Sequence, residues 1–256
     1  MNDLAFHSKS LGREARYRIV FPPAYADSSE RFPVLYLLHG MYGDRTNWFE
    51  LAHLPDHARS HKMLVVMPDA ANSWYVNSHA HPQDRYEDFI YQDLIAEVDA
   101  RYRTIPKPAA RAIAGLSMGG YAALKFALKF PELFCVAASM TGALSGPLNL
   151  GEEVAEFREV LLQAFGPPGD PRRPQNDVFA LATTAGPAKL PYLYLDCGAQ
   201  DSFLPINRDF AALLQKKHIP YEYHELPGGH DWAYWDQRLP QVLKLINQYF
   251  PTPAPQ

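Results

Sequence analysis

Residues 115 to 119 read Gly-Leu-Ser-Met-Gly and form the stretch of the chain best suited to do chemistry. In this G-x-S-x-G pattern a serine lies on a sharp corner between a strand and a helix, and each glycine leaves room for neighbouring backbone. The corner directs the serine hydroxyl outward, and the amino end of the following helix places free amides and a positive dipole beneath it. The pattern predicts that Ser117 attacks an acyl carbonyl as a nucleophile.

The segments around this pattern support a strand-to-helix corner. Residues 111–116 form a short apolar run typical of a buried parallel strand. From Met118 onward Ala, Leu and Phe recur at helical spacing, which predicts an amphipathic helix. G-x-S-x-G alone occurs by chance, and an ordinary serine in a glycine-rich turn is the alternative. The strand before it and the helix after it favour the catalytic interpretation.

A serine nucleophile needs a base, and the base needs an acidic partner that orients it. In α/β-hydrolases the chain order is Ser, then Asp or Glu, then His. His230 lies in the sequence Pro-Gly-Gly-His-Asp, directly after the last predicted strand. His224 lies within that strand, where we expect a structural or surface role, and His218 precedes it. His230 is therefore the predicted base.

Two aspartates are candidates for the acid. Asp196 is still within the predicted strand 192–197, whereas Asp201 lies in the loop beyond it. From that loop a carboxylate can reach toward His230. The sequence therefore favours Asp201 and keeps Asp196 as the alternative.

The loop after the predicted strand 34–38 reads His-Gly-Met and is the expected second side of an oxyanion hole. Such a hole needs one amide from the residue after the nucleophile, here Met118, and one from an earlier loop, here Met41. We expect His39 to shape this loop and Gly40, Trp74 and Trp232 to contact the substrate. Tyr75, Phe203 and Trp235 are expected, together with Trp74 and Trp232, to be core or site-wall residues that shape the acyl pocket.

Alternating strands and helices predict one α/β-hydrolase domain over residues 1–250, with a mostly parallel sheet flanked by helices. The segment 144–190, between the strands 134–139 and 192–197, is predicted to be a helical insertion beside the site. Residues 251–256 are predicted to be a disordered tail. The other strands are expected as a hairpin within 4–21 that turns at Gly12-Arg13, and at 34–38, 64–67, 111–116 and 221–226. Helices are expected within 48–60 and at 86–102, 152–165, 178–183, 206–217 and 231–250, with a long loop at 72–84.

The composition narrows the classes of partner. The 256 residues carry a formal net charge of −4 and form no basic cluster, which argues against nucleic acid. No stretch has the ~18 apolar residues of a membrane span, and the first residues do not resemble a signal peptide, so we expect a cytoplasmic protein without membrane contact. A chain from which a secretion signal has been removed would look the same. Cys135 and Cys197 are expected at opposite ends of the sheet as free thiols.

Two groups of histidines have spacings that also occur in metal sites. His53, His57 and His61 are spaced i, i+4, i+8, but no H-E-x-x-H accompanies them, so a solvated helix face is the favoured interpretation. His79 and His81 lie in the long loop and receive the same interpretation. The prediction is an enzyme without metal or organic cofactor.

Five segments carry a resemblance to a known family. They are Leu-His-Gly-Met at 38–41, Asn-Ser-Trp-Tyr at 72–75, Gly-Leu-Ser-Met-Gly-Gly-Tyr at 115–121, residues 196–201, and Gly-His-Asp-Trp at 229–232 with Trp235. From about residue 16 to residue 250 the chain resembles the esterase D-like family of α/β-hydrolases. That family includes tributyrin esterases, S-formylglutathione hydrolases, feruloyl and acetyl-xylan esterases and mycolyltransferases. The resemblance implies Ser117, His230 and Asp201 as the triad and the amides of Met41 and Met118 as the oxyanion hole.

Within the family the chain looks most like the tributyrin-esterase branch. S-formylglutathione hydrolases tend to have His where this chain has Leu116. The prediction is a serine carboxylesterase for short acyl esters, such as acetyl groups on small alcohols or sugars. The alternatives are an S-formylglutathione-type thioesterase, a feruloyl or acetyl-xylan esterase, an acyltransferase, or a non-catalytic binding protein on the same scaffold. A homo-oligomer is left open.

Overall fold

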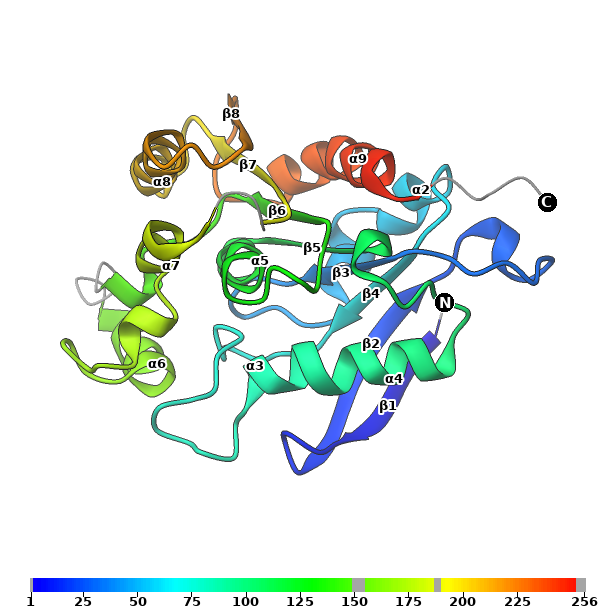
Figure 1. Ribbon diagram of the computed structural model, residues 1–256, viewed down its shortest axis with the longest axis horizontal. Coiled ribbons are helices and arrows are strands. Elements are labelled where there is room, and N and C mark those ends of the chain that lie inside the picture. The colour runs from blue at the N-terminus through cyan, green and yellow to red at the C-terminus, as the bar shows by residue number, and fades with distance from the viewer. Residues whose placement is uncertain (1, 149–154, 187–189, 252–256) are drawn as a thin grey trace.

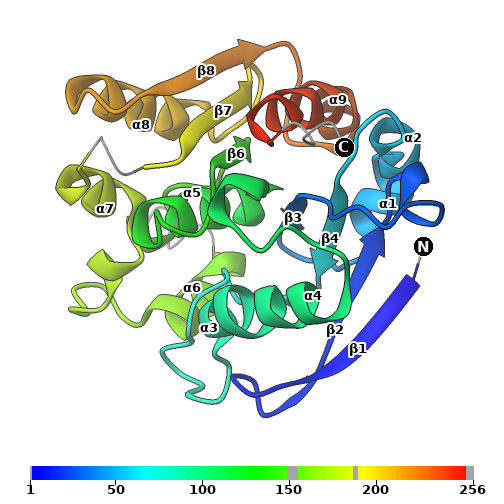
Figure 2. The same cartoon turned by 45° about the vertical axis from the view of Figure 1, so that its right-hand side comes forward.

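The computed structural model describes residues 2–148, 155–186 and 190–251, and its centre is one eight-stranded sheet (Figure 1). The strand order is β1-β2-β4-β3-β5-β6-β7-β8, so that β1 and β8 form the two edges (Figure 2). The strands are β1 (Asn2–Ser8), β2 (Arg13–Val20), β3 (Val34–Leu38), β4 (Leu64–Pro68), β5 (Arg111–Leu116), β6 (Val136–Met140), β7 (Tyr192–Gly198) and β8 (Tyr221–Leu226). The strands from β3 to β8 are parallel, whereas β2 is antiparallel to both β1 and β4. The predicted mostly parallel sheet is confirmed.

Helices cover both faces of the sheet. They are α1 (Asn47–Leu51), α2 (Leu54–Ala58), α3 (Tyr86–Asp88), α4 (Ile95–Arg101), α5 (Met118–Lys129), α6 (Ala155–Phe165), α7 (Val178–Thr184), α8 (Leu204–Lys216) and α9 (Trp232–Tyr249). Leu35 and Leu37 belong to the core on the side of α1, α2 and α9, whereas Tyr36 and Leu38 belong to the core on the side of α4, α5 and α8. Figure 1 shows these helices on the two sides of the sheet. Because successive strand residues point to opposite faces and both faces are covered, β3 is apolar throughout.

The helix predicted within 48–60 is two short helices. The chain breaks between α1 and α2 at His53, whose φ is +43°. Pro55 is the second residue of α2, and because proline lacks an N–H group and fits only the first turn, the helix has to restart just before it. The helix predicted at 86–102 is present as α3, a π-helical segment (Phe89–Leu94) and α4 in succession.

Helix α5 differs from the prediction in its surroundings. The amphipathic pattern predicted for it is wrong, because every residue from Met118 to Leu128 is buried. The sheet covers one side of α5, and α7 and the segment around Glu87 cover the other. A charged residue inside this helix, Lys125, must therefore find its partners in the protein interior.

The insertion predicted at 144–190 leaves the sheet after β6 and returns at β7, and its described part contains α6 and α7. The end of α6 is fixed to the loop that follows β4: Ser78 Oγ donates to the Gln163 carbonyl at 2.8 Å, and the His79 amide donates to the Ala164 carbonyl at 3.1 Å. Residues 149–154 lie outside the described residues. They include positions 152–154, the start of the helix predicted at 152–165. So does the predicted tail, except for Pro251.

The two cysteines are free thiols. Val136 pairs with Tyr192 across β6 and β7, so Cys135 and Cys197 are six positions apart along the sheet, about 20 Å. This confirms the prediction of opposite ends. Among the described helices, none combines the length and the apolar character needed to cross a membrane.

Candidate active site

Three side chains meet at the edge of the sheet where the parallel strands end. Ser117 follows β5, Asp201 follows β7 and His230 follows β8. The His230 Nε2 atom lies 2.9 Å from Ser117 Oγ, and its Nδ1 atom lies 2.8 Å from Asp201 Oδ2. The structure therefore brings together the predicted nucleophile, base and acid in one chain of hydrogen bonds.

Ser117 has the strained backbone that the G-x-S-x-G pattern predicts, with φ +51° and ψ −118°. A Cβ atom on Gly115 would lie 2.5 Å from the Gly119 carbonyl carbon, and one on Gly119 would lie 2.6 Å from the Leu38 carbonyl oxygen. Only glycine fits at either position. This close approach brings the corner against the end of β3.

Aromatic side chains hold the His230 ring on two sides. The rings of Phe203 and Trp235 lie 5.1 Å and 5.0 Å from it, both edge-on. Trp235 is itself fixed, because its indole N–H donates to Thr141 Oγ1 at 2.8 Å. The imidazole is thus oriented by packing as well as by its two hydrogen bonds.

The structure distinguishes the two candidate acids. Asp201 is buried, and its second oxygen accepts the Phe203 amide at 2.8 Å, which aims the carboxylate at His230. Asp196 lies in β7 and is bonded instead to the hydroxyls of Tyr194 and Tyr234, at 3.0 Å and 2.9 Å. Burial raises the pKa of Asp196 to about 6. Asp201 is therefore the carboxylate in reach of the base, and Asp196 belongs to the packing against α9.

The predicted oxyanion hole lies beside Ser117. The Met118 amide is at the amino end of α5, and Gly40 approaches the serine so closely that a Cβ atom there would lie 3.4 Å from Ser117 Cβ. Among the described residues, no acceptor is bonded to the amides of Met41 and Met118. The oxyanion role predicted for these two amides requires that they be unengaged in this way.

The two predicted substrate-contacting tryptophans lie on different faces of the sheet. Trp74 is buried with the α5 face and packs on Tyr121 and Phe165, with ring centroids 5.4 Å and 5.6 Å away. Trp232 is half-buried on the α9 face, between Trp48 and Trp235. Tyr121 lies one turn of α5 beyond Ser117, and Phe165 is the last residue of α6, so the Trp74 ring fills space between α5 and the insertion.

The histidine spacings do not make a metal site. His53 and His57 both bond to Asp236 of α9, at 3.1 Å and 2.9 Å. The His53 side chain is 66% exposed, as the predicted solvated face requires, whereas the His57 side chain is 26% exposed and partly covered by α9. His79 contacts Asp170 and Arg172 of the insertion. Within the described part of the chain, no group of three His, Cys, Asp or Glu side chains is arranged to hold a metal ion.

Sequence reasoning missed two residues near the site. Thr141 has φ +46° and holds the indole of Trp235, and no local pattern predicts this. Lys125 is fully buried next to Glu87, with its Nζ atom 2.7 Å from Glu87 Oε2. A single lysine within the run Ala-Ala-Leu-Lys-Phe-Ala-Leu was the available signal for this second residue.

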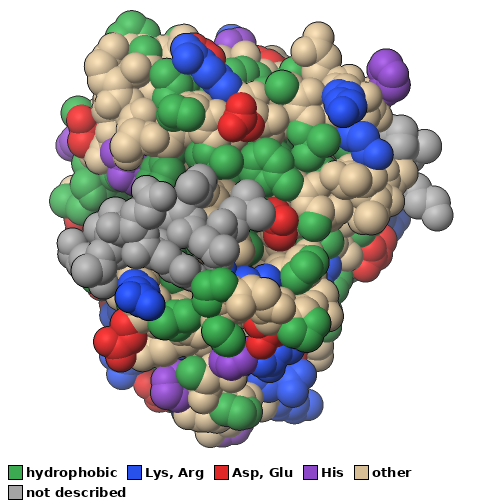
Figure 3. Space-filling model, turned by 90° about the vertical axis from the view of Figure 1, so that its left-hand side faces the viewer, with side chains coloured by type: hydrophobic (Ala, Val, Ile, Leu, Met, Phe, Trp, Pro, Cys, Tyr) green, Lys and Arg blue, Asp and Glu red, His purple; other side chains and the backbone are tan. Residues whose placement is uncertain are grey.

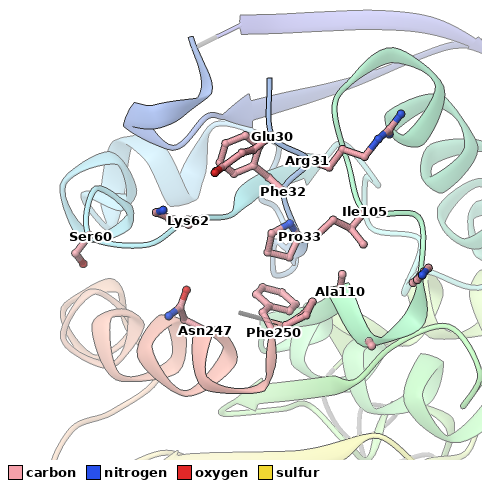
Figure 4. Close-up of a pocket in the computed structure, with 13 residues that line it drawn as sticks. Glu30, Arg31, Phe32, Pro33, Ser60, Lys62, Ile105, Ala110, Asn247 and Phe250 are labelled. Carbon is pink, nitrogen blue, oxygen red and sulfur yellow. The ribbon is translucent and has the colours of Figure 1, made fainter. Parts of the chain in front are cut away.

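A cavity of about 430 Å³ lies at the opposite, amino edge of the sheet (Figure 4). Its walls include Phe32 and Pro33 ahead of β3, Lys62 ahead of β4, Ala110 ahead of β5 and Phe250 after α9. None of the predicted site residues lines it. The length of a strand, roughly 17 Å, separates this cavity from the triad.

The face that carries α6, α7 and α8 has no single sign of charge. Figure 3 shows Lys, Arg, Asp and Glu side chains scattered over it and a band of hydrophobic side chains beside the residues drawn in grey. The described residues of this face form no basic patch of the kind that binds nucleic acid.

We compared the sequence with models of known protein families. The sequence model of the family Esterase, described as "Putative esterase", matches residues 8–246. The chain belongs to this esterase family. Its members are serine hydrolases with the α/β-hydrolase fold, and the predicted family and fold are confirmed.

Two curated relatives of this esterase are themselves esterases. An acetyl esterase from Caldicellulosiruptor saccharolyticus is 26% identical over 95% of this chain and 96% of its own length. An esterase from Mycobacterium tuberculosis is 30% identical over 88% of this chain. The match spans 54% of that mycobacterial protein, which is therefore about twice as long as the matching part.

Solved structures agree with the fold. FphF, a fluorophosphonate-binding serine hydrolase from Staphylococcus aureus, superposes with a TM-score of 0.85 at 26% identity and covers 96% of this esterase and 97% of its own chain. The S-formylglutathione hydrolase FrmB from Staphylococcus aureus gives 0.83 at 26% identity, over 96% and 98% of the two chains. Esterase chemistry is thus established at the level of the family.

Proposed function

We propose that this esterase is a carboxylesterase that removes short acyl groups through an acyl-enzyme on Ser117. The observation that carries the proposal is the continuous hydrogen-bond chain from Asp201 through His230 to Ser117, beside the amides of Met41 and Met118, which bond to no acceptor among the described residues. The match to an acetyl esterase over nearly the full length of both chains supports a small acyl group. So does Trp74, whose ring takes up space beneath the insertion.

In the proposed reaction His230 Nε2 takes the proton of Ser117 as the hydroxyl oxygen attacks the ester carbonyl. The amides of Met41 and Met118 stabilise the oxyanion of the tetrahedral intermediate. His230 then gives the proton to the departing alcohol, and Asp201 stabilises the imidazolium throughout. A water molecule, activated by His230, attacks the acyl-enzyme and releases the carboxylic acid and free Ser117.

The test is hydrolysis of p-nitrophenyl esters from acetate to palmitate, with Ser117→Ala as the blank. We expect the rate to be highest at about two to four acyl carbons, because a longer chain that finds no room loses binding free energy with each methylene. A maximum at long chains, or turnover that persists in Ser117→Ala, contradicts the proposal.

S-formylglutathione and methyl ferulate belong in the same panel. They test the thioesterase and feruloyl esterase alternatives, and added alcohols test acyl transfer to an acceptor other than water. If either compound exceeds p-nitrophenyl acetate in kcat/KM, that alternative replaces the short-chain carboxylesterase. The predicted cytoplasmic location and a homo-oligomer stay predictions.

A further inference from the structure

Tyr75, in the loop after β4, is a fully buried residue with a strained backbone. Trp74 and Tyr75 both have φ +54°, in the left-handed region. A non-glycine residue in such a conformation is strained, and it persists only where surrounding contacts determine it. The contacts that hold Tyr75 in this conformation therefore show which parts of the molecule this loop connects.

Three hydrogen bonds fix Tyr75. Its carbonyl accepts from Lys125 Nζ at 2.6 Å, and its hydroxyl donates to the His39 carbonyl at 3.0 Å. Its amide donates to Ser73 Oγ at 3.1 Å. The residue thus spans the distance between helix α5, which carries Lys125, and the end of β3, where His39 lies.

Burying the charged side chain of Lys125 inside the protein costs free energy. Lys125 is fully buried, and its charge is matched by Glu87, which also accepts from Lys129 at 2.7 Å. Burial lowers the pKa of Lys125 to about 8, against the opposing effect of Glu87. An aliphatic side chain would fill the same space without the cost of desolvating an ammonium group. Packing alone does not account for a lysine here.

The bond to His39 reaches the oxyanion loop. The Ala70 amide donates to His39 Nε2 at 3.0 Å, which assigns the ring proton to Nδ1, where it donates to the Gly40 carbonyl at 2.7 Å. His39 is therefore held at its side chain by Ala70 and at its carbonyl by Tyr75. The next residues along the chain are Gly40 and Met41, and Met41 supplies one of the two proposed oxyanion amides.

The other proposed amide, that of Met118, begins α5, and Lys125 lies about two turns further along the same helix. We infer that Tyr75 and Lys125 are positioning residues that fix the oxyanion loop relative to α5 and so set the spacing of the Met41 and Met118 amides. The inference rests on the proposed function. Oxyanion contacts strengthen in the transition state, so loss of this spacing lowers kcat and leaves KM nearly unchanged.

The experiment compares Tyr75→Phe, Lys125→Met and the double variant with the wild-type protein on p-nitrophenyl acetate. Tyr75→Phe keeps the ring and removes only the bond to His39, and we expect kcat to fall about ten- to hundredfold with KM within about twofold. Binding of a trifluoromethyl ketone, which forms a tetrahedral adduct, falls by the same factor as kcat. The double variant loses no more than the worse single variant, because both changes break one chain of contacts.

Lys129→Met is the matched control. It removes the other lysine bonded to Glu87 but no contact of Tyr75, and we expect the wild-type kcat. A folded Tyr75→Phe with the wild-type kcat, or with a change in KM alone, overturns the inference even if Lys125→Met fails to fold. So does an equal loss in Lys129→Met and Lys125→Met. Absence of Ser117-dependent turnover in the wild-type protein overturns the proposed function and this inference together.

Discussion

The two ends of the parallel strands are built differently. At the carboxyl edge the loops after β3, β4, β5 and β6 contain most of the non-glycine residues with positive φ in the described chain, namely Tyr42, Ala71, Trp74, Tyr75, Ser117 and Thr141. Around the cavity at the amino edge, none of the described lining residues has such a conformation. Residues with left-handed backbone are strained, and in this protein they are concentrated in the loops around the candidate active site.

The difference concerns preorganisation. At the carboxyl edge Ser117, Asp201 and His230 are each fixed by bonds or ring packing from at least one other segment. At the amino edge Lys62 and Lys107 line the cavity, and among the described residues neither ammonium group has a hydrogen-bond or ion-pair partner. In this molecule the described cavity therefore does not mark the candidate active site. Side chains fixed by several hydrogen bonds and ring contacts mark it better.

The largest expected effect comes from removing the nucleophile. Ser117→Ala should lower kcat/KM for p-nitrophenyl acetate by about three to six orders of magnitude, as with other triads. Lys62→Ala at the amino edge should change it by less than about twofold, because it touches no residue of the site. A similar loss in both variants would end the distinction between the two edges.

The second effect separates two aspartates at the same edge. Asp201→Asn should lower kcat by about 10⁴-fold, because an amide cannot stabilise the imidazolium or fix the tautomer of His230. Asp196→Asn should stay within about tenfold of the wild-type kcat, since the amide oxygen can still accept from Tyr194 or Tyr234. Steady-state kinetics at pH 8 decides, and the reverse order would make Asp196 the acid.

The third effect tests the close approach of the serine corner to β3. A Cβ atom on Gly119 would lie 2.6 Å and 2.7 Å from the carbonyl oxygens of Leu38 and His39, so backbone must move. Gly119→Ala should lower kcat about hundredfold and the free energy of unfolding by about 1–3 kcal/mol. Gly186 has open space around its Cβ position, and Gly186→Ala should leave activity and thermal stability unchanged.

The smallest effect is the pH dependence of stability. Burial lowers the pKa of His39 below the 6.5 of a free imidazole, so below pH 6.5 the unfolded chain binds a proton that the folded chain binds less readily. This contribution to stability is complete above pH 6.5 and is lost as the pH falls. Asp196 acts in the opposite sense. Burial raises its pKa to about 6, so its contribution to stability is present at low pH and is lost as the pH rises through about 6.

The measurement is the Tm of the wild-type protein and of His39→Asn between pH 5 and pH 7.5. The wild-type Tm should fall more steeply than the variant's on acidification, and taking the difference removes the contribution of Asp196. Parallel curves would show that His39 titrates alike in the folded and unfolded chains.

The sequence predicted the parts of the site that depend on topology. Loops that follow parallel strands meet at one edge, so Ser117, Asp201 and His230 could be brought together without knowledge of a single contact. The end of a strand also separated Asp201 from Asp196. The strand positions followed from apolar runs, which are the strongest local signal in a buried parallel sheet.

What the sequence did not predict depends on packing between distant segments. Helix α5 is covered by α7 and by the segment around Glu87, which are tens of residues away in the sequence. The sequence pattern of α5 alone therefore did not predict its burial. Lys125 meets Glu87 across 38 positions of sequence. The bonds of His53 and His57 to Asp236 span 183 and 179 positions. No local pattern carries information on such pairs.

The place where the insertion joins the sheet has a consequence for how this scaffold diversifies. The insertion leaves after β6 and returns at β7, whereas the three triad side chains follow β5, β7 and β8. Its own anchors are the loop around Ser78 and the face of α5. Under the proposed function, a segment of another length between β6 and β7 changes what surrounds the acyl group without altering the strand ends that carry Ser117, Asp201 and His230. Acyl-group preference and bond-breaking chemistry are then encoded in different parts of the chain and can change independently.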